Sequence, residues 1–183
     1  MLNLINKTVL ITGGSRGIGE ACVRLFAEAG ASVGFTYKTA KKSADRLVEE
    51  LSSKTKEKAF RVDLINETKI KKTVSSFEEE FGKIDILVKK AGMGKEEEVS
   101  KMTIDEWEET LKINLSAAFL ITKYTITGMK KNGFGRIINI SSTAGQRGEA
   151  FHSHYAASKG GMIAFTKSLG AELGRNNITV NCV

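Results

Sequence analysis

A glycine-rich turn between an apolar strand-like run and a helix-like run is the feature that most constrains this chain. The run Thr8–Thr12 (TVLIT) is short and β-branched, the turn T-G-G-S-R-G-I-G spans residues 12–19, and a helical stretch follows at 18–28. Glycines permit positive φ and let backbone N–H groups approach a phosphate, and a helix N-terminus adds partial positive charge. The spacing differs from that of a P-loop, which disfavours a kinase or GTPase. A tight turn with no ligand is the plain alternative.

Strand-like and helix-like segments alternate along the chain. Predicted strands lie at 32–37, 58–62, 84–88, 136–140 and 178–183, and predicted helices at 43–51, 67–81, 102–128 and 154–173. The long helix should begin with a capping box, with Thr103 as cap and Glu106 at the third position. Alternation of this kind implies parallel strands joined by right-handed crossovers. We therefore predict an α/β fold, a Rossmann-type doubly wound parallel sheet in three layers (α/β/α), with its ligand site at the carboxyl ends of the strands.

Length and composition limit the class of protein. The 183 residues, 41% of them hydrophobic, fit a single domain, 1–183. There is no apolar run of eighteen residues, no signal-peptide pattern, and no disulfide framework or metal spacing from the two cysteines. We expect a soluble, cytoplasmic protein without a metal or a membrane contact. The net charge of +7 is more typical of a solubilising surface than of a nucleic-acid reader, although an acidic partner or anionic substrate is compatible with it.

A tyrosine and a lysine stand four residues apart at the head of the predicted helix 154–173. Tyr155 and Lys159 therefore project from one helix face. A phenol has a reference pKa of about 10, and a nearby ammonium lowers that pKa toward the working range of an acid–base catalyst. Ser142 lies thirteen residues upstream, after strand 136–140, where its hydroxyl could hydrogen-bond a substrate carbonyl. Alone, the tyrosine–lysine spacing is weak, because any exposed helix can carry such a pair.

Four motifs in consistent order carry a resemblance. The T-G-x-x-x-G-x-G turn, Asn114, Ser142 and Tyr155-x-x-x-Lys159 resemble the short-chain dehydrogenase/reductase family over essentially the whole chain, and the segments around them look most like bacterial 3-oxoacyl-[acyl-carrier-protein] reductases. The resemblance implies that Tyr155 donates the proton as hydride arrives from a nicotinamide, and that Lys159 lowers the Tyr155 pKa and holds the nicotinamide ribose. It also implies that Ser142, rather than its neighbour Ser141, polarises the carbonyl, and that Asn114 supports a water leading away from Lys159.

The resemblance further implies a cofactor site along the strand ends. The predicted cofactor contacts are Gly13, Ser15, Arg16, Gly17, Ile18, Gly19, Tyr37, Lys38, Asp63, Leu64, Ala91 and Gly92. Asp63 and Leu64 match the position that holds the adenine ring, although an aspartate there could instead cap the next turn. Tyr37 and Lys38 stand where a carboxylate would bond the 2′-hydroxyl of NAD. Because Lys38 and Arg16 suit a 2′-phosphate, we predict NADPH (NADP+) as the cofactor.

Two features depart from the family pattern. Family members usually have two asparagines before Ala91-Gly92, whereas this chain has Lys89 and Lys90. We expect both ammonium groups to face solvent or a phosphate. The chain also stops within predicted strand 178–183, where family members continue with a Pro-Gly loop, a substrate-binding segment, a helix and a seventh strand. We therefore expect a domain truncated after the sixth strand, with C-terminal elements missing and turnover impaired.

The leading hypothesis is NADPH-dependent reduction of a ketone to a secondary alcohol, most specifically of a 3-oxoacyl group on acyl carrier protein in fatty acid synthesis. Carrier proteins are acidic, so Lys130, Lys131, Arg136 and Arg175 are candidate contacts, although an ordinary solvated face explains them as well. The alternatives are a reductase of another small ketone, sugar or alcohol, and a truncated, non-catalytic chain that binds nucleotide. We also expect a homo-oligomer, a dimer or tetramer that a real truncation would weaken. Nucleic-acid binding is a distant third reading, which would require affinity that falls steeply with salt.

Overall fold

The fold is built on a six-stranded parallel sheet. The structure is a computed structural model that describes residues 2–53 and 55–183, and its strands are ordered β3-β2-β1-β4-β5-β6. The strands are β1 (Thr8–Thr12), β2 (Ser32–Tyr37), β3 (Glu57–Arg61), β4 (Ile86–Lys89), β5 (Gly135–Asn139) and β6 (Ile178–Cys182). Every neighbouring pair is parallel. The predicted Rossmann-type doubly wound sheet is confirmed.

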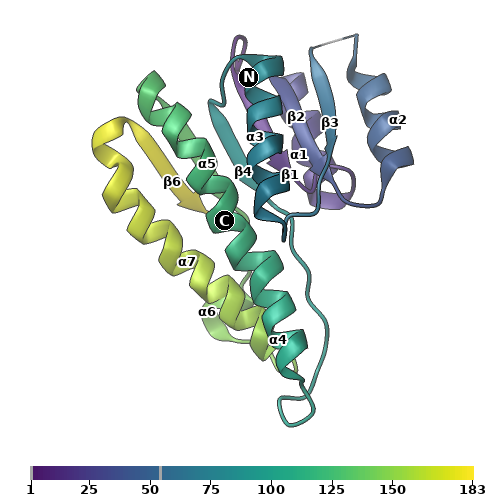
Figure 1. Ribbon diagram of the computed structural model, residues 1–183, viewed down its shortest axis with the longest axis vertical. Coiled ribbons are helices and arrows are strands. Elements are labelled where there is room, and N and C mark those ends of the chain that lie inside the picture. Colours follow the sequence, from purple (N-terminus) through teal and green to yellow (C-terminus); the bar gives the residue numbers. More distant parts are fainter. Residues whose placement is uncertain (1, 54) are drawn as a thin grey trace.

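Helices cover both faces of this sheet (Figure 1). They are α1 (Gly17–Glu28), α2 (Lys41–Leu51), α3 (Glu67–Phe81), α4 (Ile104–Leu111), α5 (Ala117–Asn132), α6 (Ala144–Arg147) and α7 (Ser153–Leu173). Alternate residues of β1 face opposite sides, as the period of a strand requires. Val9 and Ile11 pack in one core cluster with side chains of α1 and α2, and Leu10 packs in the other with side chains of α3, α5 and α7. The three predicted layers are therefore present, with a core on each side of the sheet.

One predicted element differs in kind from the structure. Instead of a single helix at 102–128, the chain forms α4, a π-helical segment at Lys112–Ser116 and then α5, which continues to Asn132. The predicted capping box is present, because Thr103 Oγ1 accepts from Glu106 N at 3.3 Å and Glu106 Oε2 accepts from Thr103 N at 3.0 Å. The other predicted boundaries lie within two residues of the structure, but α6 and a 3₁₀ turn at Gly174–Asn176 were not predicted.

The order in which strands are added to the sheet reverses between β1 and β4, and this reversal determines where a ligand site forms. The strands from β1 to β3 extend to one side and those from β4 to β6 to the other, so a crevice forms at the carboxyl ends of β1 and β4. The segment after β4 extends well beyond these strand ends before α4 begins (Figure 1). Within the described part of the chain, no helix combines the length and apolarity that crossing a bilayer requires.

Candidate active site

The glycine-rich turn after β1 forms one wall of a cavity. Gly13 has a φ of 71°, and a Cβ on Gly19 would lie 2.0 Å from the Gly13 carbonyl oxygen, so a larger residue fits neither position. The turn is tied to β2, because Gly13 N donates to Thr36 Oγ1 at 3.1 Å and Gly14 N donates to the Thr36 carbonyl at 3.0 Å. The N-cap side chain of α1 makes no hydrogen bond to the helix. The free N–H groups of its first turn suit a phosphate.

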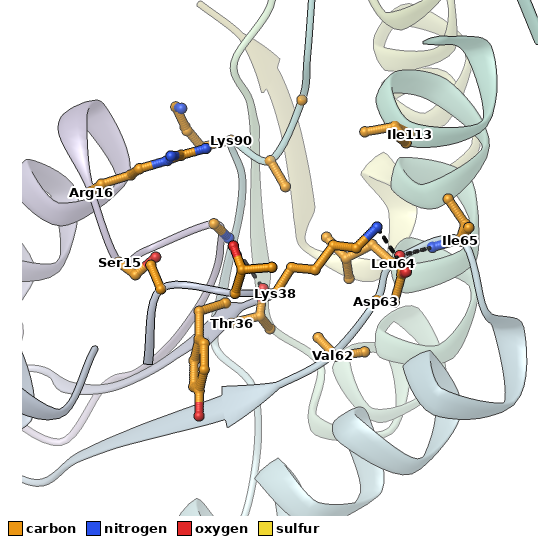
Figure 2. Close-up of a pocket in the computed structure, with 16 residues that line it drawn as sticks. Ser15, Arg16, Thr36, Lys38, Val62, Asp63, Leu64, Ile65, Lys90 and Ile113 are labelled. Carbon is orange, nitrogen blue, oxygen red and sulfur yellow. Dashed lines mark hydrogen bonds and ion pairs between the residues drawn. The ribbon is translucent and has the colours of Figure 1, made fainter. Parts of the chain in front are cut away.

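This cavity opens at the carboxyl ends of β1 to β4 and collects most of the predicted cofactor contacts (Figure 2). Nine of the twelve line it: Gly13, Ser15, Arg16, Tyr37, Lys38, Asp63, Leu64, Ala91 and Gly92. The other three, Gly17, Ile18 and Gly19, lie in the first turn of α1, and Ile18 lines an adjoining cavity. Val62, Ile65 and Ile113 add an apolar lining that the sequence patterns did not reveal, since none of them belongs to a motif. A glycine turn on one side and apolar side chains on the other suit a dinucleotide with its phosphates at the glycine turn.

The first cavity is called the cofactor cavity below, because it collects most of the predicted cofactor contacts. Its lining carries three cations and one carboxylate. Lys38 Nζ lies 2.8 Å from Asp63 Oδ2 (Figure 2), and this hydrogen-bonded ammonium lowers the pKa of the Asp63 carboxyl below its usual range. Arg16 and Lys90 also line the cavity, and neither has an acidic partner within ion-pair distance among residues 2–53 and 55–183. The end of β2 carries no carboxylate, as its sequence indicated, but Asp63 reaches Lys38 from the end of β3.

A second cavity adjoins the first and holds the predicted tyrosine–lysine pair. Its lining residues are Ile18, Lys90, Gly92, Met93, Gly94, Ile140, Ser141, Glu149, His152, Tyr155 and Lys159. Lys159 Nζ lies 5.6 Å from the centre of the Tyr155 ring and donates to the Ile140 carbonyl oxygen at 2.8 Å. Lys159 is 5% exposed, and burial, with a smaller effect of the Lys90 charge, lowers its pKa. The ammonium is thus held in place beside the phenol, as an acid–base pair requires.

The second cavity is called the catalytic cavity below, because it holds the predicted tyrosine–lysine pair. Asn114 braces its walls. It lies in the π segment, is 1% exposed, and its amide is fully hydrogen-bonded. Oδ1 accepts from Met93 N at 2.8 Å, and Nδ2 donates to the Met93 carbonyl at 2.8 Å and to Ser158 Oγ at 2.9 Å. The asparagine therefore joins the segment after β4 to α7. Its support of a water beside Lys159 stays a prediction.

The two serines after β5 occupy different places. Ser141 lines the catalytic cavity, and its hydroxyl donates to the Lys159 carbonyl oxygen at 3.0 Å. Ser142 lines a neighbouring cavity that includes neither Tyr155 nor Lys159, and its Oγ accepts from Ala144 N at 3.2 Å. The structure therefore brings Tyr155 and Lys159 together in one cavity braced by Asn114. It leaves Ser142 just outside that cavity, so its role at a carbonyl stays a prediction.

Lys89 contradicts one prediction from the sequence. Its side chain was expected to face solvent or a phosphate, but the residue is only 3% exposed. Lys89 Nζ donates to Thr122 Oγ1 at 2.7 Å and to the Ala118 carbonyl oxygen at 3.3 Å. The same Nζ lies 4.9 Å from the centre of the Phe165 ring. Burial lowers the pKa of Lys89 to about 7. The prediction was wrong because Lys89 is the last residue of β4, and strand alternation turns it into the layer of α5 and α7.

Comparisons with known proteins agree with this geometry. A family model described as "short chain dehydrogenase" matches residues 7–183. The 3-oxoacyl-[acyl-carrier-protein] reductase FabG of Vibrio cholerae serotype O1 is 38% identical over 182 residues, which cover 100% of this chain and 73% of that protein. The corresponding reductase of Aquifex aeolicus is 39% identical over 184 residues and 74% of its length. Among solved structures, NAD+-bound xylitol dehydrogenase superposes with a TM-score of 0.94 at 30% identity, over 98% of this chain and 69% of that one.

Proposed function

The chain belongs to the short-chain dehydrogenase family, and from this membership we propose that it reduces 3-oxoacyl groups on acyl carrier protein to 3-hydroxyacyl groups with NADPH. The general reaction class follows from membership of this family: the protein is an oxidoreductase that acts on CH–OH groups and binds NAD or NADP. The observation that carries the proposal is the buried Lys159 ammonium held beside Tyr155, in a cavity that adjoins the cationic cofactor cavity. Relatives that match the full chain bear the names of 3-oxoacyl-[acyl-carrier-protein] reductases.

The chain's own residues would supply the proton and hold the charge. A bound reduced nicotinamide would supply the hydride for the carbonyl carbon. In the proposed reaction Tyr155 donates its phenolic proton to the carbonyl oxygen, and the Lys159 ammonium stabilises the phenolate that remains. Ser142 would donate a hydrogen bond to the same oxygen. Asn114 holds the segment after β4 against α7 through its hydrogen bonds with Met93 and Ser158.

The cofactor cavity offers distinct groups for each part of a dinucleotide. The glycine turn and the first turn of α1 would hold the phosphates. Asp63 and Leu64 would contact the adenine, and Arg16 and Lys38 would contact the 2′-phosphate of NADPH. The excess of two cations over the single carboxylate supports a cofactor with an extra phosphate.

We expect NADPH to bind roughly tenfold more tightly than NADH, because a charge-assisted contact to the 2′-phosphate contributes about 1.5–3 kcal/mol. Replacing Arg16 with alanine should remove most of this preference while NADH affinity changes little. Fluorescence titration of each reduced nucleotide measures both affinities. Arg175→Ala, an exposed change on the 3₁₀ turn, is the control and should alter neither affinity. Equal binding of NADPH and NADH by the wild-type protein would contradict the cofactor proposal.

We expect kcat/KM for an acetoacetyl group on carrier protein to exceed that for a small free ketone by about tenfold or more, and to fall as salt is added. The structure reduces the number of cations that are free to contact the carrier protein. Lys130 lies 3.7 Å from Glu172, and Arg136 donates to two backbone carbonyls, so Lys131 and Arg175 are the freer cations. Lys131→Gln with Arg175→Gln should reduce the carrier advantage without changing the rate with the free ketone.

The same assay distinguishes a carrier-linked substrate from the alternative substrates, a small ketone, sugar or alcohol. Xylitol, with the oxidised nucleotide and in the reverse direction, is the natural comparison, because xylitol dehydrogenase shares this fold. Turnover of a polyol or a simple ketone as efficient as that of the carrier-linked group would favour a reductase of another ketone, sugar or alcohol.

A further inference from the structure

Lys90 has no role in the mechanism above, yet it lies where the two cavities meet. Among the lining residues, only Lys90 and Gly92 belong to both the cofactor cavity and the catalytic cavity. A dinucleotide that lies across both cavities has its pyrophosphate between its two halves, which is at this junction. The inference therefore rests on the proposed cofactor site and concerns one further contact within it.

The backbone fixes where the Lys90 side chain begins. Thr12 Oγ1 accepts from Lys90 N at 3.1 Å and from Ala91 N at 3.2 Å, which ties the end of β4 to the end of β1. The preceding residue, Lys89, turns into the layer of α5 and α7. Lys90 therefore turns the other way, into the crevice that faces the glycine turn.

The positive charge of Lys90 is uncompensated. The cofactor cavity has one carboxylate, Asp63, and it is paired with Lys38 at 2.8 Å. No carboxylate lies within 4.0 Å of Lys90 or Arg16 in the part of the chain that the structure describes. In the view of Figure 2, the end of Lys90 lies on the other side of the cavity from Lys38 and Asp63. The unpaired ammonium of Lys90 and the uncapped start of α1 favour an anion here.

We propose that Lys90 binds the pyrophosphate of the dinucleotide at the junction of the two cavities. An ammonium here adds a charge-assisted hydrogen bond to the backbone N–H groups that the glycine turn already offers. A pyrophosphate would also offset the charge that, together with burial, holds the pKa of Lys159 below its usual value. Anion binding at Lys90 would thereby favour the charged form of Lys159 on which proton donation by Tyr155 depends.

The test compares the dissociation constants of NADP+ and NAD+ for the wild-type protein and Lys90→Met, measured by isothermal titration calorimetry. Both nucleotides contain the pyrophosphate, so both constants should rise by about tenfold. Lys90→Arg should restore most of the affinity. Adenosine 2′-monophosphate has no pyrophosphate and should bind both proteins equally. Lys95→Met, on the same segment with an exposed side chain, is the matched control and should bind as wild type does.

The design separates this inference from the choice of cofactor. If NAD+ binds better than NADP+, the NADPH proposal fails, but the effect of Lys90→Met on both nucleotides still decides the role of Lys90. Unchanged constants for both nucleotides would overturn the inference. A loss confined to NADP+ would overturn it too, since Lys90 would then contact the 2′-phosphate. An equal loss in Lys95→Met, or a wild-type protein that binds neither nucleotide, would also overturn it.

Discussion

Replacing Tyr155 with phenylalanine is expected to lower kcat for thioester reduction by a factor of about 10²–10⁴, the usual contribution of a positioned general acid. The change removes one oxygen atom and keeps the ring. The centre of that ring lies 6.4 Å from the centre of the His152 ring, edge-on, and 5.6 Å from Lys159 Nζ. Phenylalanine keeps the ring and therefore these packing contacts. Nucleotide affinity and the free energy of unfolding should therefore stay close to those of the wild type. Loss of reduced-nicotinamide absorbance with an acetoacetyl thioester measures the rate.

Tyr124→Phe is the matched control for this substitution. Tyr124 lies on α5, where its hydroxyl hydrogen-bonds Glu67 at 2.5 Å on the surface. Removing that hydroxyl should leave the rate unchanged. A Tyr155→Phe variant as fast as the wild type would show that another group donates the proton. A wild-type protein that binds NADPH without consuming it would instead favour the non-catalytic, nucleotide-binding alternative.

Replacing Lys89 with methionine is expected to stabilise the protein by about 4 kcal/mol at pH 7, because the variant no longer buries an ammonium. Methionine has a similar length and no charge. Thr122 Oγ1 keeps a partner after the change, since it also donates to the Ala118 carbonyl at 2.6 Å. Urea unfolding measures the difference in the free energy of unfolding. Lys72→Met, an exposed change on α3, should shift that free energy by less than about 0.5 kcal/mol.

The same variant should change how stability depends on pH. The Lys89 pKa is about 7 in the folded protein and about 10.4 in an unfolded chain. Below pH 7 both states bind the proton, and the folded state carries the full cost of the buried charge. Between these two pKa values the unfolded state binds more protons, so wild-type stability should rise with pH by up to about 1.4 kcal/mol per unit.

In Lys89→Met this contribution should disappear, so the difference between variant and wild type should shrink steadily from pH 7 to pH 10. Other titratable groups are common to both proteins, so their contributions cancel in the difference. A constant difference across this range would show that Lys89 is not buried as a titrating group.

The sequence predicted the strands and most helices closely because their signals are local. Apolar runs, the glycine turn and the Thr103 capping box each act over a few residues. The π segment could not be predicted in this way. Its Asn114 forms hydrogen bonds with Met93, 21 residues earlier, and with Ser158, 44 residues later. The π-helical turn therefore depends on tertiary contacts, which a local pattern does not contain.

Side-chain directions at the strand ends were also beyond a pattern-based prediction. Lys89 and Lys90 look equivalent in the sequence, but strand alternation buries one and turns the other into the crevice. The ion pair of Lys38 with Asp63 joins the ends of two strands. Family motifs reach further than local patterns, since nine of the twelve residues that they predict as cofactor contacts line one cavity. Ser142, one residue from Ser141, shows how a single step along the chain changes the cavity that a side chain lines.

The pairing of β1 with β4 has a consequence for how the protein acquires activity as it folds. β1 pairs with β2 between residues 24 apart, such as Thr8 and Ser32, whereas its pairing with β4 joins residues 77 apart, such as Val9 and Ile86. Contacts of such long range form late and slow the overall rate. The cofactor cavity takes its walls from both sides of this pairing. Nucleotide binding should therefore appear only with the last, least local step of folding.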